Sequence, residues 1–346
     1  MPLLIDLYSD TVTRPTAGMR KAIAEAEVGD EQKGEDPTTR RLEDKVAELL
    51  GHSSALFFPS ATMANEVALL LHCRRGDELV AADQCHLFFA EAGGPAVHAG
   101  VMTRPIPAPT GVFTGEDVRR QYRTAKGSHY PVTRLVSVEN TTNMGGGIAW
   151  PMENLTSVLD TAKELGLNTH LDGARLMNAA VKLGVSPDRI AGRFDSATLC
   201  LSKGLGAPAG AVLAFDKTRW HQVRLYKQRM GGALRQSGIL AAAGLYALEN
   251  HVTRLAEDHA HAQLLAQGLS GIDVLDPESP STNMVFFRWR SKRLSCPAFL
   301  DKCLERGLRM SEGGDDRVRA VTHLDISRPQ IDQALKIIQD VCKEAS

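Results

Sequence analysis

The sequence lacks any paired arrangement of cysteines. Its six cysteines are Cys73, Cys85, Cys200, Cys296, Cys303 and Cys342. None belongs to a Cys-x-x-Cys pair, and their spacing shows no regular framework. This pattern disfavours a disulfide-stabilised secreted domain, so we expect free thiols, no bound metal and a cytoplasmic location.

Long apolar segments and blocks of like charge are also absent. The longest strongly apolar stretch, 239–248, is interrupted by Gly244, and it has about half the length needed to cross a bilayer. The 40 basic and 41 acidic residues give a net charge of -1 without a long run of one sign. This charge balance therefore disfavours nucleic acid and anionic membranes as partners. The N-terminus, with Asp6 and Asp10, has no basic segment before an apolar one, so we expect no signal or transit peptide.

The composition is that of a globular protein with a substantial core. Hydrophobic residues make up 43% of the 346 positions and charged residues 23%. A chain of this length is expected to form one large domain and a smaller one. We place an N-terminal arm at 1–15, a large domain at 16–250, and a small domain with its linking helix at 251–346.

Short apolar runs alternate with helical patterns through most of the chain. This alternation predicts an α/β fold, with a mainly parallel sheet flanked by helices and a small C-terminal α+β domain. The expected strands are 55–58, 79–82, 134–139, 168–172, 197–202 and 211–215, followed by 283–289 and 318–324 in the small domain. The expected helices include 19–27, 38–50, 235–251, 253–269 and 328–342.

Four predicted strands end in polar or small residues. These ends are Pro59-Ser60, Glu139-Asn140, Asp172-Gly173 and Ser202-Lys203. In open α/β sheets, ligands bind at the carboxyl ends of the strands. We therefore expect these four ends to converge on one site.

Asp172 and Lys203 are the residues at this edge with the most informative chemistry. They end strands about one β-α-β unit apart, so they can face each other. A lysine can form a Schiff base with pyridoxal phosphate, and an aspartate beside the pyridine nitrogen keeps that ring protonated as an electron sink. Singly, Lys203 is more readily a surface lysine in a glycine-rich turn and Asp172 a helix cap. Together they favour a pyridoxal-phosphate site.

Other residues suit such a site, although each also has a plainer interpretation. Ser60, Ala61 and Thr62 join a strand to a helix, and helix N-termini bind phosphate, but Ser60 is equally suited to cap the helix. His86 follows a strand and can stack on a planar ring, whereas a lone histidine more often has a structural role.

Two arginines are suited to bind a carboxylate. A guanidinium group grips a carboxylate through two hydrogen bonds, and Arg175 lies three residues after Asp172 while Arg319 lies in the small domain. Such a grip would decide which bond of an amino-acid α-carbon breaks. For either arginine alone, a surface ion pair is the ordinary role.

Taken together, these motifs resemble the L-threonine aldolase family of fold-type-I pyridoxal-phosphate enzymes. The matching segments are 6–15, 59–65, 139–141, 170–175, 202–208, 235–238 and 318–325, in family order across nearly the whole chain. The resemblance implies retro-aldol cleavage of L-threonine, L-allo-threonine or a similar L-β-hydroxy-α-amino acid. The products would be glycine and an aldehyde, which is acetaldehyde for threonine.

The resemblance also implies a role for each matching residue and a homodimer or homotetramer with sites shared between subunits. The implied roles are the Schiff base for Lys203, the pyridine partner for Asp172, ring stacking for His86, phosphate binding for Ser60, Ala61, Thr62 and a second subunit's Arg235, and substrate binding for Ser9, Arg175 and Arg319.

The chain departs from the family pattern at several of these places. Tyr8 stands where arginine is common, Lys33 where an aromatic is common, Ala61 where glycine is frequent, and Gln228 where a basic residue is expected. Thr142, at the substrate, replaces a histidine that lies close to the β-hydroxyl in the family. The base for that hydroxyl is therefore open, with a bound water and His86 as the candidates.

Three alternatives stay open from the sequence. The same cofactor site can support transamination, β-elimination or racemisation, because all of these reactions use the lysine, the aspartate and a carboxylate clamp. An aldolase with a phenylserine preference is a second alternative. The changes at Tyr8 and Thr142 also allow a non-catalytic binding protein on an enzyme fold.

Overall fold

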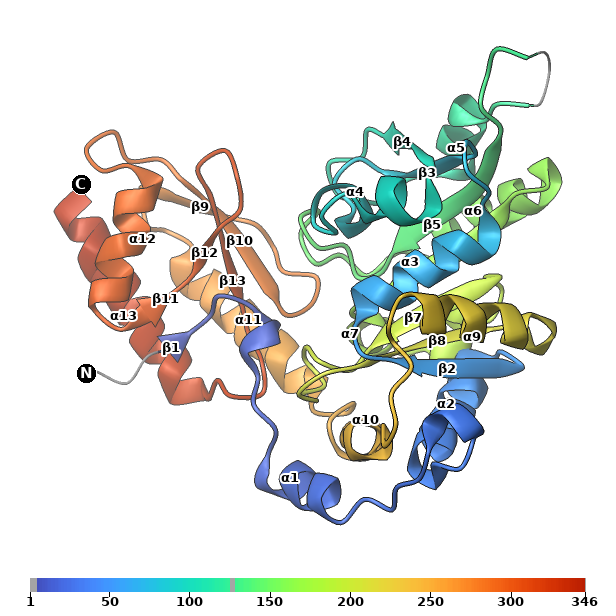
Figure 1. Ribbon diagram of the computed structural model, residues 1–346. Coiled ribbons are helices and arrows are strands. Elements are labelled where there is room, and N and C mark those ends of the chain that lie inside the picture. The colour runs from blue at the N-terminus through green and yellow to red at the C-terminus, as the bar shows by residue number, and fades with distance from the viewer. Residues whose placement is uncertain (1–4, 125–127, 346) are drawn as a thin grey trace.

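The computed structural model describes residues 5–124 and 128–345. Figure 1 shows two parts, a larger one around a central sheet and a smaller one that carries the C-terminus. The central sheet has the strand order β2-β8-β7-β6-β5-β3-β4. Its strands are β2 (Ser54–Phe58), β3 (Glu78–Ala82), β4 (Met102–Ile106), β5 (Thr133–Glu139), β6 (Asn168–Gly173), β7 (Ser196–Cys200) and β8 (Ala211–Phe215).

This sheet is mainly parallel, as the sequence predicts. Only β8 runs against its neighbours β2 and β7. The six predicted strands are all present with small shifts at their ends, and β7 ends at Cys200 rather than at Ser202. The seventh strand, β4, was not predicted. It is an edge strand that contains Arg104 and Pro105 and pairs only with β3, and an edge tolerates a proline that an interior strand excludes.

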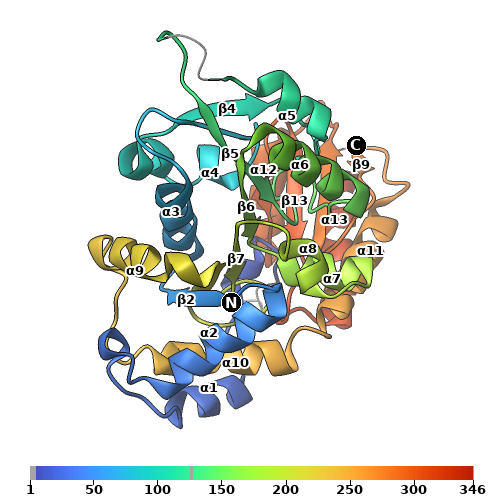
Figure 2. The same ribbon diagram turned by 90° about the vertical axis from the view of Figure 1, so that its right-hand side faces the viewer.

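Helices cover both faces of the sheet, as Figure 2 shows from the side. The helix α3 packs with α9 against one face, while α2, α6 and α7 contribute to the core on the other. The helices of the large part are α1 (Ala17–Ala24), α2 (Pro37–Leu50), α3 (Ala61–His72), α4 (His86–Phe89), α5 (Gly115–Gln121), α6 (Met152–Leu165), α7 (Leu176–Leu183), α8 (Pro187–Ala191), α9 (Trp220–Arg229) and α10 (Gly238–Asn250), with the short η2 (Glu31–Lys33), η3 (Pro95–Ala99) and η4 (Lys217–Arg219).

Local capping residues decide where these helices begin. The predicted helix 19–27 begins earlier, at Ala17, because the hydroxyl of Thr16 accepts the amide of Met19 at 3.3 Å. Asp36 caps α2 in the same way by accepting the amide of Thr39 at 2.8 Å. The helix α2 ends as predicted at Gly51, which has a left-handed conformation.

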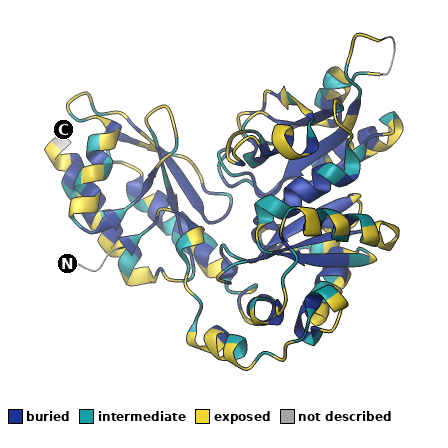
Figure 3. Ribbon diagram, in the orientation of Figure 1, coloured by how far each residue is buried: buried dark blue, intermediate teal, exposed yellow. Residues whose placement is uncertain are grey.

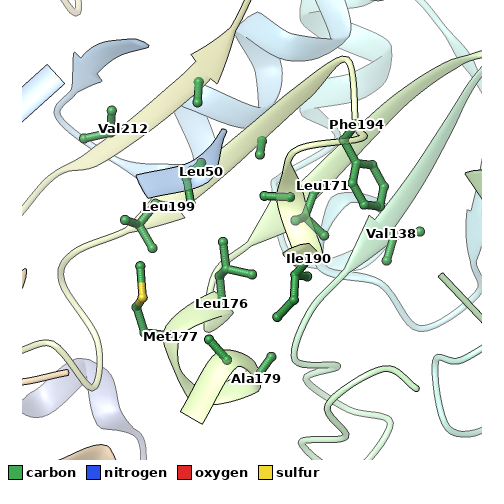
Figure 4. Close-up of a cluster of buried hydrophobic side chains, with 14 of the residues drawn as sticks. Leu50, Val138, Leu171, Leu176, Met177, Ala179, Ile190, Phe194, Leu199 and Val212 are labelled. Carbon is green, nitrogen blue, oxygen red and sulfur yellow. The ribbon is translucent and has the colours of Figure 1, made fainter. Parts of the chain in front are cut away.

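Alternation along the strands builds a separate core on each face of the sheet. Phe57 belongs to the larger core and its neighbour Phe58 to the core beneath α3 and α9. Figure 3 shows the sheet almost entirely buried between its helices. Figure 4 shows part of the larger core, where Leu171 of β6 and Leu199 of β7 meet Leu176 of α7. This packing fixes the strand ends that carry the site.

The smaller part contains an antiparallel sheet in the order β12-β13-β10-β9. Its predicted strands and helices are present. The elements are β9 (Leu275–Pro277), β10 (Met284–Trp289), β11 (Leu308–Arg309), β12 (Ser311–Glu312), β13 (Arg317–Val321), α11 (Leu255–Leu269), α12 (Cys296–Glu305) and α13 (Arg328–Ala345).

The N-terminal segment packs into the smaller part, whereas a separate extended arm would not. The strand β1 (Ile5–Asp6) pairs in parallel with β11, and Ile5 and Leu7 are fully buried in the smaller part's core. The segment then continues through η1 (Asp10–Val12) toward the large part. Residues 1–4 of the predicted arm lie outside the described residues.

No disulfide joins any of the six cysteines in the described residues, in agreement with the sequence. Within the described ranges, no helix combines the length and the apolar character needed to cross a membrane.

Candidate active site

Lys203 lies in a tight loop that follows β7. The carbonyl of Lys203 accepts the amide of Gly206 at 2.8 Å, and the loop is closed by a 3.0 Å bond from the amide of Leu201 to the carbonyl of Gly210. Gly206 has a φ of 78°, a conformation that favours glycine. The hydroxyl of Thr13 donates to the Lys203 carbonyl at 2.9 Å, so the N-terminal segment packs directly on this loop.

The amine of Lys203 faces the ends of several elements. Its charge interacts with Asp10 of the N-terminal segment, with His86 of α4 and with Glu139 of β5. Glu139 is paired across the sheet with Asp172 of β6. Three of the four predicted strand ends therefore meet at one edge, as expected from the parallel strands.

Asp172 is buried, and both of its carboxylate oxygens accept hydrogen bonds. Its Oδ1 accepts the amide of Ala174 at 3.0 Å, and its Oδ2 accepts Nδ2 of Asn65 at 3.0 Å. The same Asn65 nitrogen donates to Oε1 of Glu91 at 3.1 Å. The two hydrogens of one amide thus bridge two carboxylates, and Asp172 is held in a single orientation.

A chain of hydrogen bonds fixes the direction of the Asn65 amide. Because Nδ2 of Asn65 donates to both carboxylates, its Oδ1 must accept, so the proton lies on Nε2 of His170, 3.2 Å away. Nδ1 of His170 then accepts from Ser196 at 2.8 Å, and Ser196 accepts from Nε2 of His72 at 2.7 Å. Burial lowers the pKa of His170 to about 3 and that of His72 to about 4, so both rings are neutral at pH 7.

His86 is oriented by Glu91. Its Nδ1 lies 2.8 Å from Oε1 of Glu91. This hydrogen bond raises the pKa of His86, although burial alone would lower it. A carboxylate at Nδ1 places the proton of the neutral ring on that nitrogen, which leaves Nε2 with a lone pair.

Arg175 and Asp10 form a buried, two-pronged ion pair. Nε of Arg175 donates to Oδ2 of Asp10 at 2.7 Å, and Nη2 donates to Oδ1 at 2.6 Å. Burial alone would raise the pKa of Asp10, but the Arg175 guanidinium holds it well below its usual range. Two of the five N–H donors of Arg175 are therefore already engaged. To bind a substrate carboxylate through two hydrogen bonds, as predicted, Arg175 would have to use its remaining N–H donors.

Arg319 is the less satisfied of the two arginines. Its Nε is buried and has no hydrogen-bond partner among the described residues. Burial and the nearby charge of Arg175 lower the pKa of Arg319 to about 10. A guanidinium that is partly buried and incompletely paired is a strong binding group for an anion.

Ser9 belongs to the N-terminal segment, which runs next to β13, the strand of this arginine. The carbonyl of Leu7 accepts the amide of Val321, two residues from Arg319, at 2.9 Å. The Ser9 side chain caps η1 by accepting the amide of Thr11 at 3.2 Å. Its hydroxyl hydrogen has no acceptor among the described residues.

Comparison with known proteins places these residues in a family. The sequence model of the beta-eliminating lyase family matches residues 6–292. Low-specificity L-threonine aldolase 1 of Arabidopsis thaliana is 39% identical, over 97% of this chain and 95% of that protein. The low specificity L-threonine aldolase of Escherichia coli (strain K12) is 41% identical, over 95% of this chain and 96% of that protein. The chain belongs to this L-threonine aldolase family.

A solved structure agrees with the predicted fold. The threonine aldolase of Leishmania major matches with a TM-score of 0.84 at 19% identity, over 97% of this chain and 99% of that one. The resemblance to the L-threonine aldolase family and the predicted α/β architecture are thus both confirmed.

The phosphate-binding turn predicted from the family forms the start of α3. The Ser60 hydroxyl caps the helix by accepting the amide of Met63 at 3.2 Å, which is the plainer of its two interpretations. Ala61 and Thr62 are the first residues of the helix, so their amides have no partner within it. They remain directed toward any anion that binds there.

Arg235, the remaining predicted phosphate ligand in this family, points elsewhere in its own chain. Its side chain is 68% exposed and pairs with Asp30 at 3.3 Å. No hydrogen bond or ion pair within the described part of the chain joins it to the turn at Ser60–Thr62. Its role toward the phosphate stays a prediction about a second subunit.

Thr142, at the position of the family histidine, supports a loop. Its hydroxyl accepts the amide of Ile148 at 3.1 Å, and its amide donates to the Ile148 carbonyl at 3.0 Å. Thr142 is buried and fixes the segment between these residues. Its contact with a substrate stays a prediction.

Four residues with a place in this site were given no role from the sequence. Asp10 and Asn65 lie inside matching motifs, but only the structure shows what they contact. Glu91 follows His86 by five residues, without a motif. Glu139 marks a strand end, and burial together with Asp172 raises its pKa to about 7.

Proposed function

We propose that this chain is a pyridoxal-phosphate enzyme that cleaves L-β-hydroxy-α-amino acids, including L-threonine and L-allo-threonine, into glycine and an aldehyde. The observation that carries the proposal is the incompletely paired guanidinium of Arg319 beside Arg175, at the same site as Lys203 and the oriented Asp172. In this site, Arg319 can bind a substrate carboxylate next to the amine of Lys203 and the oriented carboxylate of Asp172. The aldolase relatives support the same activity.

The residues present fit the cofactor. Lys203 would hold it through its amine, Asp172 would pair with its pyridine nitrogen, and the free amides of Ala61 and Thr62 would bind its phosphate. The buried Asn65 bridge fits this role because it presents Asp172 in a single orientation. When bound, the cofactor supplies an electron sink for the electron pair released at Cα.

The chain's own groups would orient the amino acid. Arg319, with Ser9 and the free edge of Arg175, would bind the substrate carboxylate. Because Asp10 neutralises Arg175 within the protein, most of the uncompensated positive charge lies at Arg319. Fixing the carboxylate sets the rotation about Cα and thereby selects the Cα–Cβ bond for cleavage.

We assign the proton of the β-hydroxyl to His86. Thr142 has no basic group near neutral pH, whereas Nε2 of His86 has a lone pair because Glu91 holds the proton on Nδ1. As the Cα–Cβ bond breaks, this nitrogen would take the hydroxyl proton and the aldehyde would leave. Protonation at Cα then gives glycine. A bound water is the competing base, and full activity in His86→Phe would favour it.

The proposal is tested by product analysis with L-threonine, L-allo-threonine and both β-configurations of phenylserine. We expect equal amounts of glycine and aldehyde. A keto acid, ammonia or a racemised substrate as the main product would contradict the aldolase assignment. Arg319→Leu is expected to raise KM about 30- to 150-fold, because the loss of a charged hydrogen-bonding group costs about 2–3 kcal/mol.

Arg317→Leu is the matched control for this variant. Arg317 lies on the same strand but pairs with Glu278 through Nε at 2.7 Å. Its loss should leave KM within about twofold, since partly exposed ion pairs contribute little. Equal effects of the two substitutions would remove Arg319 from the substrate site.

We further propose a cytoplasmic homodimer or homotetramer in which Arg235 of one subunit completes the phosphate site of another. The exposed side chain of Arg235 and the free amides at the start of α3 support a shared site. The free thiols support a reducing compartment.

A further inference from the structure

Two carboxyl groups meet beneath His86. Glu66 of α3 is 1% exposed, and neither of its oxygens receives a hydrogen bond from an N–H or O–H donor in the described ranges. The Oε2 of Glu91 lacks a donor in the same way. Glu66 lies against the turn that Glu91 begins, because a Cβ atom at Gly94 would come 2.1 Å from Oε1 of Glu66 and the Gly94 amide donates to the Glu91 carbonyl at 2.8 Å. The charge of Glu91 and a side-chain hydrogen bond with it both raise the pKa of Glu66. Two ionised carboxylates in such contact repel strongly, so one of them must carry a proton.

The surroundings show which of the two is protonated. Oε1 of Glu91 already accepts hydrogen bonds from His86 at 2.8 Å and from Asn65 at 3.1 Å, and these favour its ionised form. Glu66 has no comparable donor. Burial, followed by the charge of Glu91, raises the pKa of Glu66 to about 8. At neutral pH, Glu66 is therefore the carboxylic acid and Glu91 the carboxylate.

The carboxyl group of Glu66 occupies the space where a side chain at position 94 would lie. A Cβ atom at this position would lie 2.1 Å from Oε1 of Glu66 and 2.6 Å from its carboxyl carbon. Any other residue at position 94 would displace Glu66. The close approach is therefore a specific feature of this chain's packing.

We propose that Glu66 is a positioning residue that donates its carboxyl proton to Oε2 of Glu91 and thereby holds Oε1 of Glu91 on Nδ1 of His86. The inference rests on the proposed function, since His86 has its role there. Glu66 does not touch the substrate, and it acts only through Glu91. The orientation and the proton affinity of the His86 ring therefore depend on Glu66, although Glu66 does not contact the ring.

Loss of the Glu66 proton changes the charge around His86. The charged groups that act on the ring are Glu91, Asp172, Glu139 and Lys203. When Glu66 ionises, it adds a negative charge and repels Glu91. The pKa of His86 should then rise, and the hydrogen bond that orients the ring should lengthen.

The test compares the wild-type protein with Glu66→Gln by NMR of isotope-labelled histidine. Glutamine has a similar shape, donates a hydrogen bond to Glu91 and cannot ionise. The signal of His86 is assigned by its loss in His86→Phe. In the cofactor-free wild type, we expect an inflection of this signal near the pKa of Glu66, about 8, that is absent in Glu66→Gln.

Cofactor affinity gives a second readout. With added pyridoxal phosphate, the ratio of the wild-type Kd to the Glu66→Gln Kd should be near one at pH 7. It should rise at least about threefold by pH 9, a change of roughly 0.6 kcal/mol. A constant ratio together with an unchanged His86 inflection in Glu66→Gln would overturn the inference.

Glu43→Gln is the matched control. Glu43 is another carboxyl group, whose pKa burial raises to about 7, and it accepts the amide of Phe57 rather than contacting Glu91. This substitution should leave the His86 titration unchanged. If no variant binds pyridoxal phosphate, the proposed function fails, while the titration of the cofactor-free protein still decides the role of Glu66.

Discussion

Asn65 connects the two halves of the site through a single amide. One of its hydrogens holds Asp172 and the other holds Glu91, which in turn orients His86. The carboxylate proposed to bind the cofactor ring and the histidine proposed to stack on it are thus both oriented by one side chain. His170 fixes the direction of this amide. A change at Asn65 would therefore disturb the orientation of both Asp172 and Glu91.

Asn65→Asp tests this connection with almost no change in shape. The new carboxylate cannot donate to Asp172 or Glu91 and would repel both. Hydrogen bonds to charged groups contribute about 1.5–3 kcal/mol, so we expect the Kd for pyridoxal phosphate to rise about 10–100-fold. The measurement is an absorbance titration of the cofactor-free protein.

His72→Gln is the control for this titration. His72 lies at the far end of the series of hydrogen bonds that begins at Asn65, where it donates to Ser196. Its substitution should change the Kd by less than about threefold, because the Asn65 donors stay in place. A normal affinity in Asn65→Asp would show that Asp172 needs no support from the amide.

Single residues differ in how well the sequence predicts their place in the site. Lys203, Asp172 and Arg319 carry a recognisable chemistry, and the strand ends indicate where it gathers. Glu66 and Glu91 have no such signal. Their roles depend on a contact between a helix and a later loop, and on the absence of a side chain at position 94.

Among the elements, the N-terminal segment joins the two parts of the molecule at the site. It pairs with β11 and β13 in the smaller part, and its Asp10 binds Arg175 at the start of α7 in the larger part. Asn283 also donates to Asp10 at 3.3 Å. This segment therefore ties the predicted substrate-binding arginine Arg319 to the sheet edge that carries Lys203.

Asp10→Asn should destabilise this junction strongly. Removing one partner of a buried ion pair leaves the Arg175 charge uncompensated and costs about 3–5 kcal/mol. Because the pKa of Asp10 is lowered in the folded state, its stabilisation is present above the ordinary aspartate value of 3.8 and is lost as the pH falls below it. The free energy of unfolding of wild type and variant should therefore differ most near neutral pH and converge in acid. Urea unfolding of both proteins between acid and neutral pH measures this difference in the free energy of unfolding.

Asp6→Asn provides the comparison for the junction. Asp6 pairs with Arg309 at 3.2 Å, and both side chains are partly exposed. This substitution should cost less than about 1 kcal/mol. An equally small loss in Asp10→Asn would mean that the buried pair does not stabilise the junction.

Elements with strong periodicity were predicted well, and those fixed by tertiary pairing were not. The buried strands of the central sheet have continuous apolar runs, which is why they were predictable. The strand β4 has a mixed composition and depends on its hydrogen bonds to β3. The pairing of β1 with β11 joins residues about 300 positions apart in the sequence, which no local pattern indicates.

For the whole molecule, the proposed assembly depends on the position of Arg235. Its side chain is exposed in its own chain, while the start of α3 has free amides. The architecture of a single chain follows from the alternation of strands and helices. The proposed completion of its site by a neighbouring subunit cannot be predicted in this way, because it depends on a contact between two copies of the chain.

Complementation between inactive variants tests this assembly. Lys203→Ala and Arg235→Ala are each expected to have little activity. After the two are mixed and allowed to exchange subunits, half of the dimers should contain both variants, and each of these has one intact site. We expect recovery of about a quarter of the wild-type activity. No recovery, despite exchange demonstrated by mass spectrometry, would contradict a shared site.

The covalent attachment of the cofactor is the central claim of this account. The direct measurement is to treat the protein with pyridoxal phosphate and borohydride, digest it, and locate the modified residue by mass spectrometry. We expect the pyridoxyl group on Lys203, and no modification of Lys227, which is buried against Glu31. Modification at another lysine in place of Lys203, or no modification at all, would contradict the account.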